Sequence, residues 1–401
     1  MATQAYESER EAVEQLKEAR RRMGTELAKV IVGQEDVIEH LIVAVLAGGH
    51  CLLTGAPGLA KTLLIKSLSQ LFHLKFQRIQ FTPDLMPADI TGTEILQQTD
   101  HERRMAFVRG PIFANMILAD EINRTPPKTQ AALLEAMQEH HVTAAGISHA
   151  LGEPFFVFAT QNPIEMEGTY PLPEAQLDRF MFNVWIGYLS EDDEVAAVRQ
   201  TTTTDPEPIE PLFTGDDLLR FHSVVRRVPI AEDVVRYAVR IAAASRPGAD
   251  NPRDFINEWV TWGAGLRASQ YMVLGGKARA LLYGRAHVTF EDIRALAHPV
   301  LRHRVLINYR AEAEGIATDN LIDRLLSAYV RGQFLLCLSV GGAATIALLA
   351  FGIREALLLG TLAGILEAVP YLGPFLGAVP PVLIALGTDP MRAVWVAVTF
   401  T

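Results

Sequence analysis

The chain has 401 residues, of which 49% are hydrophobic and 20% are charged, and this balance excludes a disordered or fibrous protein. Its 36 basic and 46 acidic side chains give a net charge of -10, which argues against a general nucleic-acid coat because basic side chains provide most of the binding to polyanions. Two cysteines, each in an apolar run, offer neither a disulfide framework nor a thiolate metal cluster, so we expect a reducing compartment.

The first 30 residues contain a charged, helix-like run, SEREAVEQLKEARRRM. They lack the apolar stretch and small-residue cleavage site of a secretory signal. We therefore expect this part of the protein to be cytoplasmic.

The following part of the chain alternates between predicted strands and helices. An apolar run at 50–54 is followed by the loop GAPGLAKT and then by leucines at helical spacing. Residues 116–119 and 155–159 are further strand candidates. Strands that alternate with helices predict the α/β class, with a parallel sheet covered on both faces.

The loop GAPGLAKT has the composition of a phosphate-binding loop. Its glycines allow backbone N–H groups to converge on a phosphate, and Lys61 and Thr62 begin the next helix. Lys61 would contact the β- and γ-phosphates of ATP, and Thr62 would bind Mg²⁺. The strict pattern has glycine where this chain has Ala60. The expected nucleotide-binding residues of the loop are Gly55, Ala56, Pro57, Gly58, Leu59, Ala60, Lys61 and Thr62.

Polar residues end two of the predicted strands. Asp120 and Glu121 follow the apolar run MILA, which predicts two carboxylates at the ligand-binding edge of the sheet. Asp120 would then bind Mg²⁺, and Glu121 would polarise the attacking water. Asn162 ends another strand, where its amide could contact that water or the γ-phosphate. The alternatives are a helix-capping Asp-Glu pair and an ordinary turn asparagine.

Six motifs together resemble the MoxR branch of the AAA+ ATPases over about residues 10–328. They are VGQ (32–34), GAPGLAKT (55–62), ILADEINR (117–124), ATQNP (159–163), LPEAQLDRF (172–180) and GAGLRAS (263–269). The resemblance implies an AAA+ core and a helical lid. It also adds Val32 and Gly33 to the nucleotide-binding residues, and an alanine at position 60 is usual in that branch.

The resemblance assigns roles to two arginines. Arg179 matches the arginine finger, which acts on the ATP of a neighbouring subunit and implies a ring, expected to be a hexamer. Arg267 matches the sensor 2 arginine of the lid, although here it follows Gly-Leu where the family commonly has Ser-Pro. For each arginine the alternative is a structural ion pair. Two predicted hairpins, 93–98 with 104–109 and 141–145 with 147–151, would point toward the ring pore or its client.

The composition changes near residue 329. Residues 329–401 carry equal numbers of basic and acidic side chains, so the net charge belongs entirely to 1–328. The uncharged run 334–353 would span about 30 Å as a helix, the thickness of a bilayer core, and 356–386 contains prolines that must break or kink a helix. We therefore expect a membrane segment over 334–386; the alternative is a buried hydrophobic hairpin.

The tail resembles part of the membrane domain of the autoinducer-2 exporter family, mainly through PYLGP at 370–374. Within a membrane, Glu367 would be a candidate functional residue. The expected domains are an α/β core at 1–200, a linker at 201–212, a helical lid at 213–328 and the hydrophobic fragment at 329–401.

Two functions follow from these patterns. The first is a Mg²⁺-dependent ATPase of the MoxR type that remodels or matures a partner protein, in that family often one with a von Willebrand factor A domain. The alternative is a nucleotide-responsive regulatory or anchoring module for a membrane protein, in which turnover is incidental. No specific nucleic-acid partner is expected.

Overall fold

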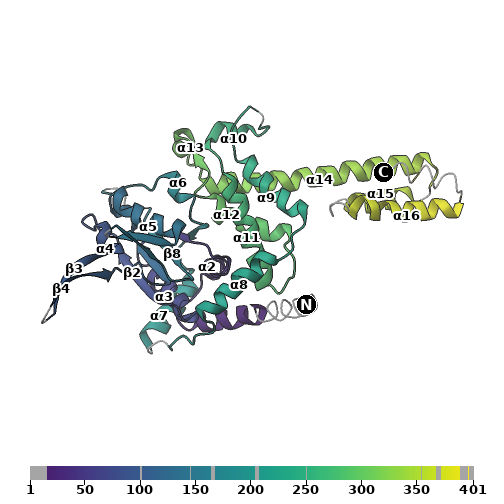
Figure 1. Cartoon of the computed structure of the whole chain (residues 1–401). Helices are drawn as coiled ribbons and strands as arrows, with labels where there is room; N and C mark the ends of the chain where they lie inside the picture. Colours follow the sequence, from purple (N-terminus) through teal and green to yellow (C-terminus); the bar gives the residue numbers. More distant parts are fainter. Residues whose placement is uncertain are drawn as a thin grey trace. The chain divides into compact units, whose positions relative to one another are not determined.

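The computed structural model describes residues 16–99, 102–144, 146–163, 168–203, 207–249, 251–353, 355–366, 372–388 and 396. The chain divides into two compact units, Met1–Asp319 and Asn320–Thr401. Figure 1 colours them from purple to light green and from light green to yellow.

A five-stranded parallel sheet forms the centre of the first unit. Its strands are β1 (Cys51–Gly55), β2 (Phe76–Gln80), β5 (Met116–Asp120), β8 (Phe156–Gln161) and β9 (Phe182–Ile186), in the order β2-β5-β8-β1-β9. Every pair is parallel, and β1, β5 and β8 are buried along most of their length. The predicted α/β class and the three predicted strands are therefore confirmed, while β2 and β9 were not anticipated.

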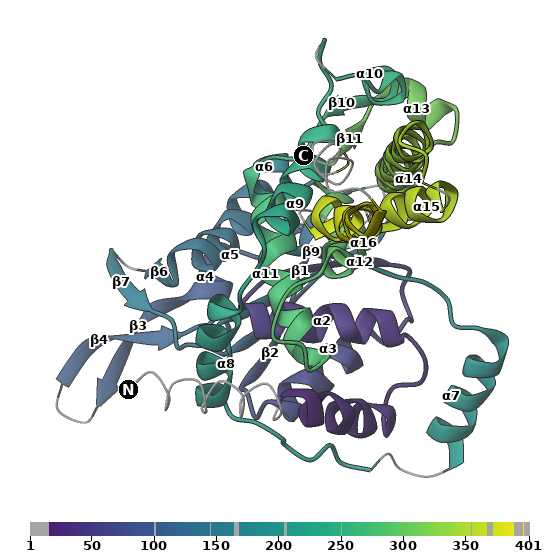
Figure 2. The same cartoon turned by 90° about the vertical axis from the view of Figure 1, so that its right-hand side faces the viewer.

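Helices cover both faces of this sheet. One face carries α2 (Glu35–Ala47) and α3 (Lys61–Leu71), and the other carries α4 (Pro87–Thr91) and α5 (Pro127–Glu139) (Figures 1 and 2). Phe81, Ile117 and Leu133 belong to the apolar core on the second face, where burial of aliphatic and aromatic side chains provides the main stabilisation. A helix over residues 16–28 precedes α2.

Two antiparallel hairpins extend the α/β unit, as predicted. The longer pairs β3 (Gly92–Thr99) with β4 (Glu102–Arg109), and the shorter pairs β6 (His141–Ala144) with β7 (Ile147–Ala150). The β3–β4 hairpin projects away from the sheet (Figure 1) and exposes apolar side chains, among them Leu96.

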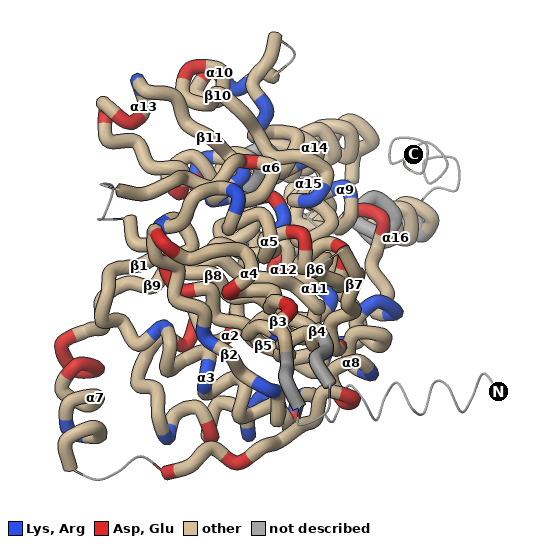
Figure 3. The backbone as a smooth tube through the Cα atoms, turned by 60° about the vertical axis from the view of Figure 1, so that its left-hand side comes forward, with Lys and Arg blue, Asp and Glu red and all other residues tan. Residues whose placement is uncertain are grey.

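Short elements connect the later strands. They are η1 (Ile122–Arg124), α6 (Glu174–Leu177) and α7 (Glu191–Thr203). Helix α7 begins with four consecutive acidic residues, visible as red segments in Figure 3, which is favourable at the positive end of a helix dipole.

The rest of the first unit is mainly helical, as predicted. Its elements are α8 (Gly215–Arg227), α9 (Glu232–Ala244), α10 (Asp254–Trp259), β10 (Val260–Trp262), α11 (Leu266–Leu282), α12 (Phe290–Leu301), β11 (Leu306–Ile307) and α13 (Tyr309–Ala313). Capping boxes start two of these helices, with Thr214 and Asp217 at α8 and Thr289 and Asp292 at α12.

The last three helices are α14 (Thr318–Ala350), α15 (Ala356–Leu366) and α16 (Leu372–Thr388). Within the described residues, the apolar run 356–386 forms α15 and α16, and α16 continues through Pro380 and Pro381, where a break or kink was expected. No helix in the described parts of the chain combines the length and apolarity needed to cross a bilayer, so the predicted span at 334–353 is not confirmed. Glu367 lies outside the described residues.

Candidate functional site

The loop after β1 has the backbone of a phosphate cradle. Gly55 ends the strand, and a side chain there would lie 2.5 Å from the Ile186 carbonyl oxygen, so only glycine fits. Gly58 has a φ of 84°, with open space around the position that a Cβ would take. Ala60 adopts a φ of 55° immediately before α3, in the left-handed region that favours glycine. The position where the motif has glycine is therefore one where the backbone uses glycine's freedom.

Lys61 lies at the first position of α3, close to two carboxylates. Its Nζ donates a hydrogen bond of 2.7 Å to the Gly55 carbonyl oxygen, which holds the ammonium back over the loop. Partial burial lowers the pKa of Lys61, and the charges of Asp120 and Glu121 oppose that shift. Thr62 follows on the same turn, half-buried beside the loop. The predicted cation and the predicted acidic pair thus come together at the carboxyl edge of the sheet.

Asp120 is held on both of its oxygens. Its Oδ1 accepts a hydrogen bond of 2.6 Å from Thr160 Oγ1, and its Oδ2 forms an ion pair of 2.5 Å with Arg78 from β2. Thr160 is itself buried, and its hydroxyl also accepts a 2.8 Å hydrogen bond from the Glu121 backbone N–H. One threonine on β8 therefore bonds to both members of the acidic pair at the end of β5.

Glu121 has a strained backbone and two side-chain partners. Its φ of 57° is unusual for a residue other than glycine, and such strain is often found at functional sites. Its Oε2 accepts a hydrogen bond of 3.1 Å from Gln80 Nε2 and pairs with Arg124 Nε at 3.0 Å. Asn162, at the end of β8, is only 8% exposed. These side chains border the edge where the phosphate loop lies.

A pocket of about 310 Å³ adjoins the loop. Val32, Gly58 and Ala60 line it, together with apolar side chains of α7 such as Val198. The neighbouring Gly33 has a φ of 68°, and a Cβ there would lie 3.0 Å from Leu189 Cδ2. Residues of the segment 32–34 and of the phosphate loop therefore line the same pocket.

The two predicted arginines lie around Asp178. Arg179 NH1 donates a 2.7 Å hydrogen bond to the Leu134 carbonyl oxygen of α5. Arg267, in the first turn of α11, forms a 3.5 Å ion pair with Asp178. Arg304 is nearly fully buried and pairs with the same carboxylate at 2.7 Å. No described contact joins either predicted arginine to Lys61 or Asp120 of the same chain.

Sequence reasoning missed the residues that hold the acidic pair. Arg78, Gln80 and Thr160 all act through contacts between segments about 40 residues apart, so no local pattern marks them. The one available signal was the position of Thr160 just before Asn162, at the end of a predicted strand. Arg304 was missed for the same reason, because its partner lies on a distant loop.

This fold and site define a P-loop nucleotide-binding protein with an α/β core and a helical lid. Residues 50–182 match the family model described as ATPase family associated with various cellular activities (AAA), and 256–325 match the AAA lid domain. Residues 299–401 match the AI-2E family transporter model.

Similar proteins show to which branch of the AAA+ ATPases the chain belongs. Chaperone MoxR1 of Mycobacterium tuberculosis is 42% identical over 308 residues, which cover 77% of this chain and 81% of that protein. A crystal structure from Cytophaga hutchinsonii is 39% identical, with a TM-score of 0.74, and the match covers 82% of this chain and 98% of the other. The chain belongs to the MoxR family of AAA+ ATPases. A stretch of 77 residues, 19% of this chain, is 46% identical to the putative transport protein YrrI of Bacillus subtilis and covers 22% of that protein.

Proposed function

We propose that this protein is a Mg²⁺-dependent ATPase that uses hydrolysis to remodel or mature a partner protein. The observation that carries the proposal is the convergence of Lys61, Asp120 and Glu121 beside an open phosphate loop. Membership in an ATPase family supports the same conclusion.

The residues suggest a division of roles. The backbone N–H groups of 55–62 and the Lys61 ammonium would bind the phosphates, while Val32 and Gly33 would border the rest of the nucleotide in the adjoining pocket. Glu121 would orient and polarise the attacking water, with Asn162 beside it at the end of β8.

The oxygen donors at this edge fit a magnesium ion. The Thr62 hydroxyl and the Asp120 carboxylate are the hard ligands that Mg²⁺ prefers, and the ion would neutralise charge on the phosphates. Both Asp120 oxygens already have partners, Thr160 and Arg78. Because a carboxylate oxygen has more than one lone pair, Asp120 can add a metal, and loss of the Arg78 pair would favour this.

We infer that Arg179 acts on a neighbouring subunit, which requires a ring, as is common in AAA+ ATPases. Support comes from the fact that Arg179 bonds to α5 while the phosphate loop has its own cation in Lys61. Arg267 would contact the γ-phosphate of its own subunit after release from Asp178, an ion pair of 3.5 Å that is weak because it is partly exposed.

The proposed client is a protein, since the chaperone MoxR1 is a relative. The exposed apolar side chains of the β3–β4 hairpin, such as Leu96 and Met105, suit a protein surface. A partner with a von Willebrand factor A domain stays part of the proposal. The core is proposed to face the cytoplasm, where ATP is available.

A second function, anchoring, is favoured by the transporter-family match of the tail. We propose the domain division 1–200, 201–212, 213–328 and 329–401, with 334–386 as the attachment to a membrane. The described side chains of α14 that follow residue 333 include exposed Phe334, Leu335 and Leu338, which is consistent with burial against an apolar partner or lipid.

ATP hydrolysis by the full chain in detergent, compared with residues 1–328, tests both functions. We expect turnover in both forms and a fall of about 100-fold or more in Glu121→Gln, with ATP binding retained, because only the polarised water is lost. Glu135→Gln, an exposed carboxylate on α5, is the matched control.

Normal hydrolysis by Glu121→Gln would refute the assigned role. If neither form hydrolyses ATP but both bind it, the regulatory or anchoring function is favoured. Turnover in the truncated form alone would identify the tail as inhibitory.

A further inference from the structure

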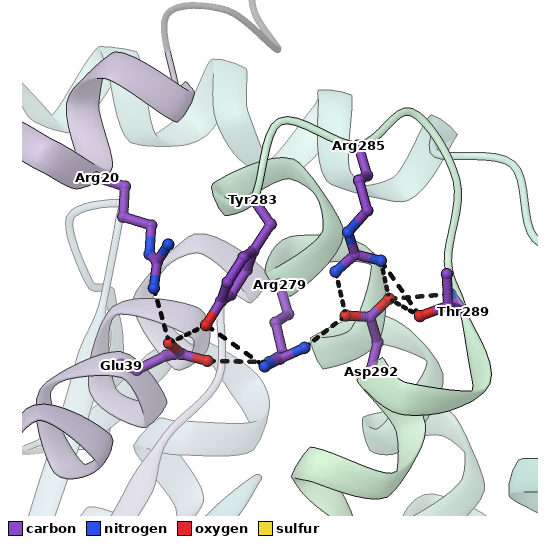
Figure 4. Close-up of polar contacts among 7 residues, drawn as sticks. All are labelled: Arg20, Glu39, Arg279, Tyr283, Arg285, Thr289 and Asp292. Carbon is purple, nitrogen blue, oxygen red and sulfur yellow. Dashed lines mark hydrogen bonds and ion pairs between the residues drawn. The ribbon is translucent and has the colours of Figure 1, made fainter.

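A network of charged side chains joins the α/β core to the helical lid (Figure 4). At its centre is Arg279, on α11, whose side chain is only 13% exposed. Its Nε donates a hydrogen bond of 2.9 Å to Glu39 Oε1, and its NH1 donates one of 2.8 Å to Asp292 Oδ1. One guanidinium therefore bridges a carboxylate of the core helix α2 and a carboxylate of the lid helix α12.

On the lid side of this network, both oxygens of the Asp292 carboxylate accept hydrogen bonds. Asp292 is completely buried, and it also accepts two hydrogen bonds of 2.6 Å from Arg285 and two of 2.9 Å from Thr289. Burial opposes its ionisation, but the hydrogen bonds from Arg285, Thr289 and Arg279 outweigh burial and hold the pKa of Asp292 below its usual value. Loss of Arg279 would thus leave this buried charge paired.

On the core side of the network, the Glu39 carboxylate is more exposed than Asp292. Glu39 Oε2 accepts a 2.8 Å hydrogen bond from the Tyr283 hydroxyl and pairs with Arg20 at 3.3 Å. The Arg20 guanidinium also lies over the Tyr283 ring, 3.8 Å from its centre. Helix 16–28, α2 and the end of α11 thus meet at one glutamate.

This meeting point lies behind the nucleotide pocket. Glu39, Tyr283 and Gly33 line a second hollow of about 720 Å³, while Val32 and Gln34 line the pocket beside the phosphate loop. Segment 32–34 is therefore the wall between the two hollows. It leads directly into α2, which begins at Glu35.

The same network reaches the other side of the site through α11. Arg267 lies in the first turn of this helix, and Arg279 lies in its last turns, about 18 Å farther along the axis. An unbroken helix transmits a shift at one end to the other. Fixing Arg279 against α2 therefore fixes both Arg267 and the wall at 32–34.

We propose that Arg279 is a positioning residue that holds the lid against α2 and so sets the affinity of the site for ATP. The inference rests on the proposed function. Mutations in such networks typically change coupling by about 0.5 to 2 kcal/mol, which corresponds to about 2- to 30-fold in affinity. Asp120 ends β5 and Glu121 follows it, and no described contact joins either to this network, so we expect the larger effect on binding.

The test compares Arg279→Met with the wild-type full chain. We expect KM for ATP, and Kd for a slowly hydrolysed ATP analogue, to rise about three- to tenfold, with kcat changed by less than about twofold. Arg279→Lys should restore part of the affinity, because a lysine keeps the charge but cannot bridge two carboxylates as a planar fork. Thermal melting of each variant checks that the fold is retained.

A double variant separates coupling from independent damage. If Arg279 acts through its ion pair with Glu39, the double variant Glu39→Gln with Arg279→Met should have a KM for ATP no higher than that of the more affected single variant. Multiplication of the two single effects would contradict the proposal.

Arg310→Met is the matched control. Arg310 also pairs with two carboxylates, Glu258 and Glu314, and lies over the Trp259 ring, but all of these contacts stay within the lid. KM of this variant should stay within about twofold of wild type.

A lower melting temperature with unchanged KM and Kd in Arg279→Met would show a merely structural role and overturn the inference. If the wild-type chain neither binds nor hydrolyses ATP, the proposed function fails first, and the inference falls with it. Wild-type turnover with an unaffected Arg279→Met refutes the inference alone.

Discussion

The phosphate-loop edge of the sheet and the arginine cluster at Asp178 use opposite arrangements of charge. At the edge, Lys61 bonds to a backbone carbonyl and lies near two carboxylates, with open space at Gly58. At the cluster, Arg267 and Arg304 share one carboxylate. In the first region the cation lies beside open space, whereas in the second both arginines are already bound to a carboxylate of their own chain.

The difference indicates which parts of the site a single subunit can complete. The edge contains the proposed phosphate, metal and water contacts within about 110 residues of chain, from Gly55 to Asn162. In the proposed function, the cluster would contribute only after Arg267 leaves Asp178 and Arg179 meets another molecule. Two predictions, the larger expected effect first, test this distinction, and a third concerns the stability of the sheet.

The largest effect is expected at Lys61. Lys61→Ala removes the cation from the phosphate loop, and we expect ATP binding to fall by about 100-fold or more, because hydrogen bonds to charged groups are strong in partly buried sites. Titration with a slowly hydrolysed ATP analogue measures this. Lys66→Ala, an exposed lysine one turn later in α3, is the control and should bind normally. Comparable binding by both variants would contradict the proposed site.

Arg179→Ala should lower turnover by about 100-fold with little change in binding. The decisive measurement mixes this variant with Lys61→Ala. If Arg179 acts on a neighbouring subunit, a Lys61→Ala subunit can supply the arginine to an intact phosphate loop, so the mixture should recover measurable phosphate release. Arg240→Ala, an exposed arginine on α9, is the control. If such mixtures assemble but phosphate release does not recover, Arg179 acts in the site of its own subunit. The proposed difference between the two regions would then be wrong.

The third prediction concerns stability at the opposite end of β1. His50 is buried, with one nitrogen near the Met137 carbonyl oxygen and the other accepting from the Val157 N–H. Burial lowers its pKa from 6.5 to about 4. The folded state therefore binds fewer protons than the unfolded state, and the stabilisation present above pH 6.5 is lost as the pH falls toward 4.

For His50 the expected loss of unfolding free energy is about 3 kcal/mol between those pH values. His50→Gln keeps a donor and an acceptor but does not titrate, so its unfolding free energy should fall less between pH 7 and pH 5. Denaturant unfolding at several pH values measures the difference. Equal slopes for both proteins would show that His50 does not control acid sensitivity.

Local patterns predicted the edge well. The loop 55–62, the strand before it and the carboxylates after 116–119 each depend on neighbours in sequence, and the structure brings them together. Strand β2 was missed because FQRIQ has no apolar run and becomes a strand through pairing with β5, whereas FNVWI of β9 is a short apolar run that was not used as a strand signal.

Local sequence patterns could not identify side-chain partners that lie far apart in the sequence. Arg78, Arg279 and Arg304 are ordinary arginines in sequence, and their roles depend on carboxylates 13 to 240 residues away. Composition predicted helices in the tail correctly, but the apolar run 334–353 did not predict where α14 begins, because this helix starts at Thr318 and ends at Ala350. A pattern of apolar residues indicates that a face is buried, but it does not identify the element that packs against that face.

Ala60 has a consequence for the entropy of binding. Glycine in the left-handed region leaves a free loop many alternative conformations, whereas alanine at a φ of 55° restricts them and adds about 1 kcal/mol of local strain. A loop that starts with fewer conformations loses less freedom when it closes around a phosphate. The methyl group that departs from the strict motif thus makes the loop stiffer, and in the proposed function nucleotide binding would depend less on ordering the loop.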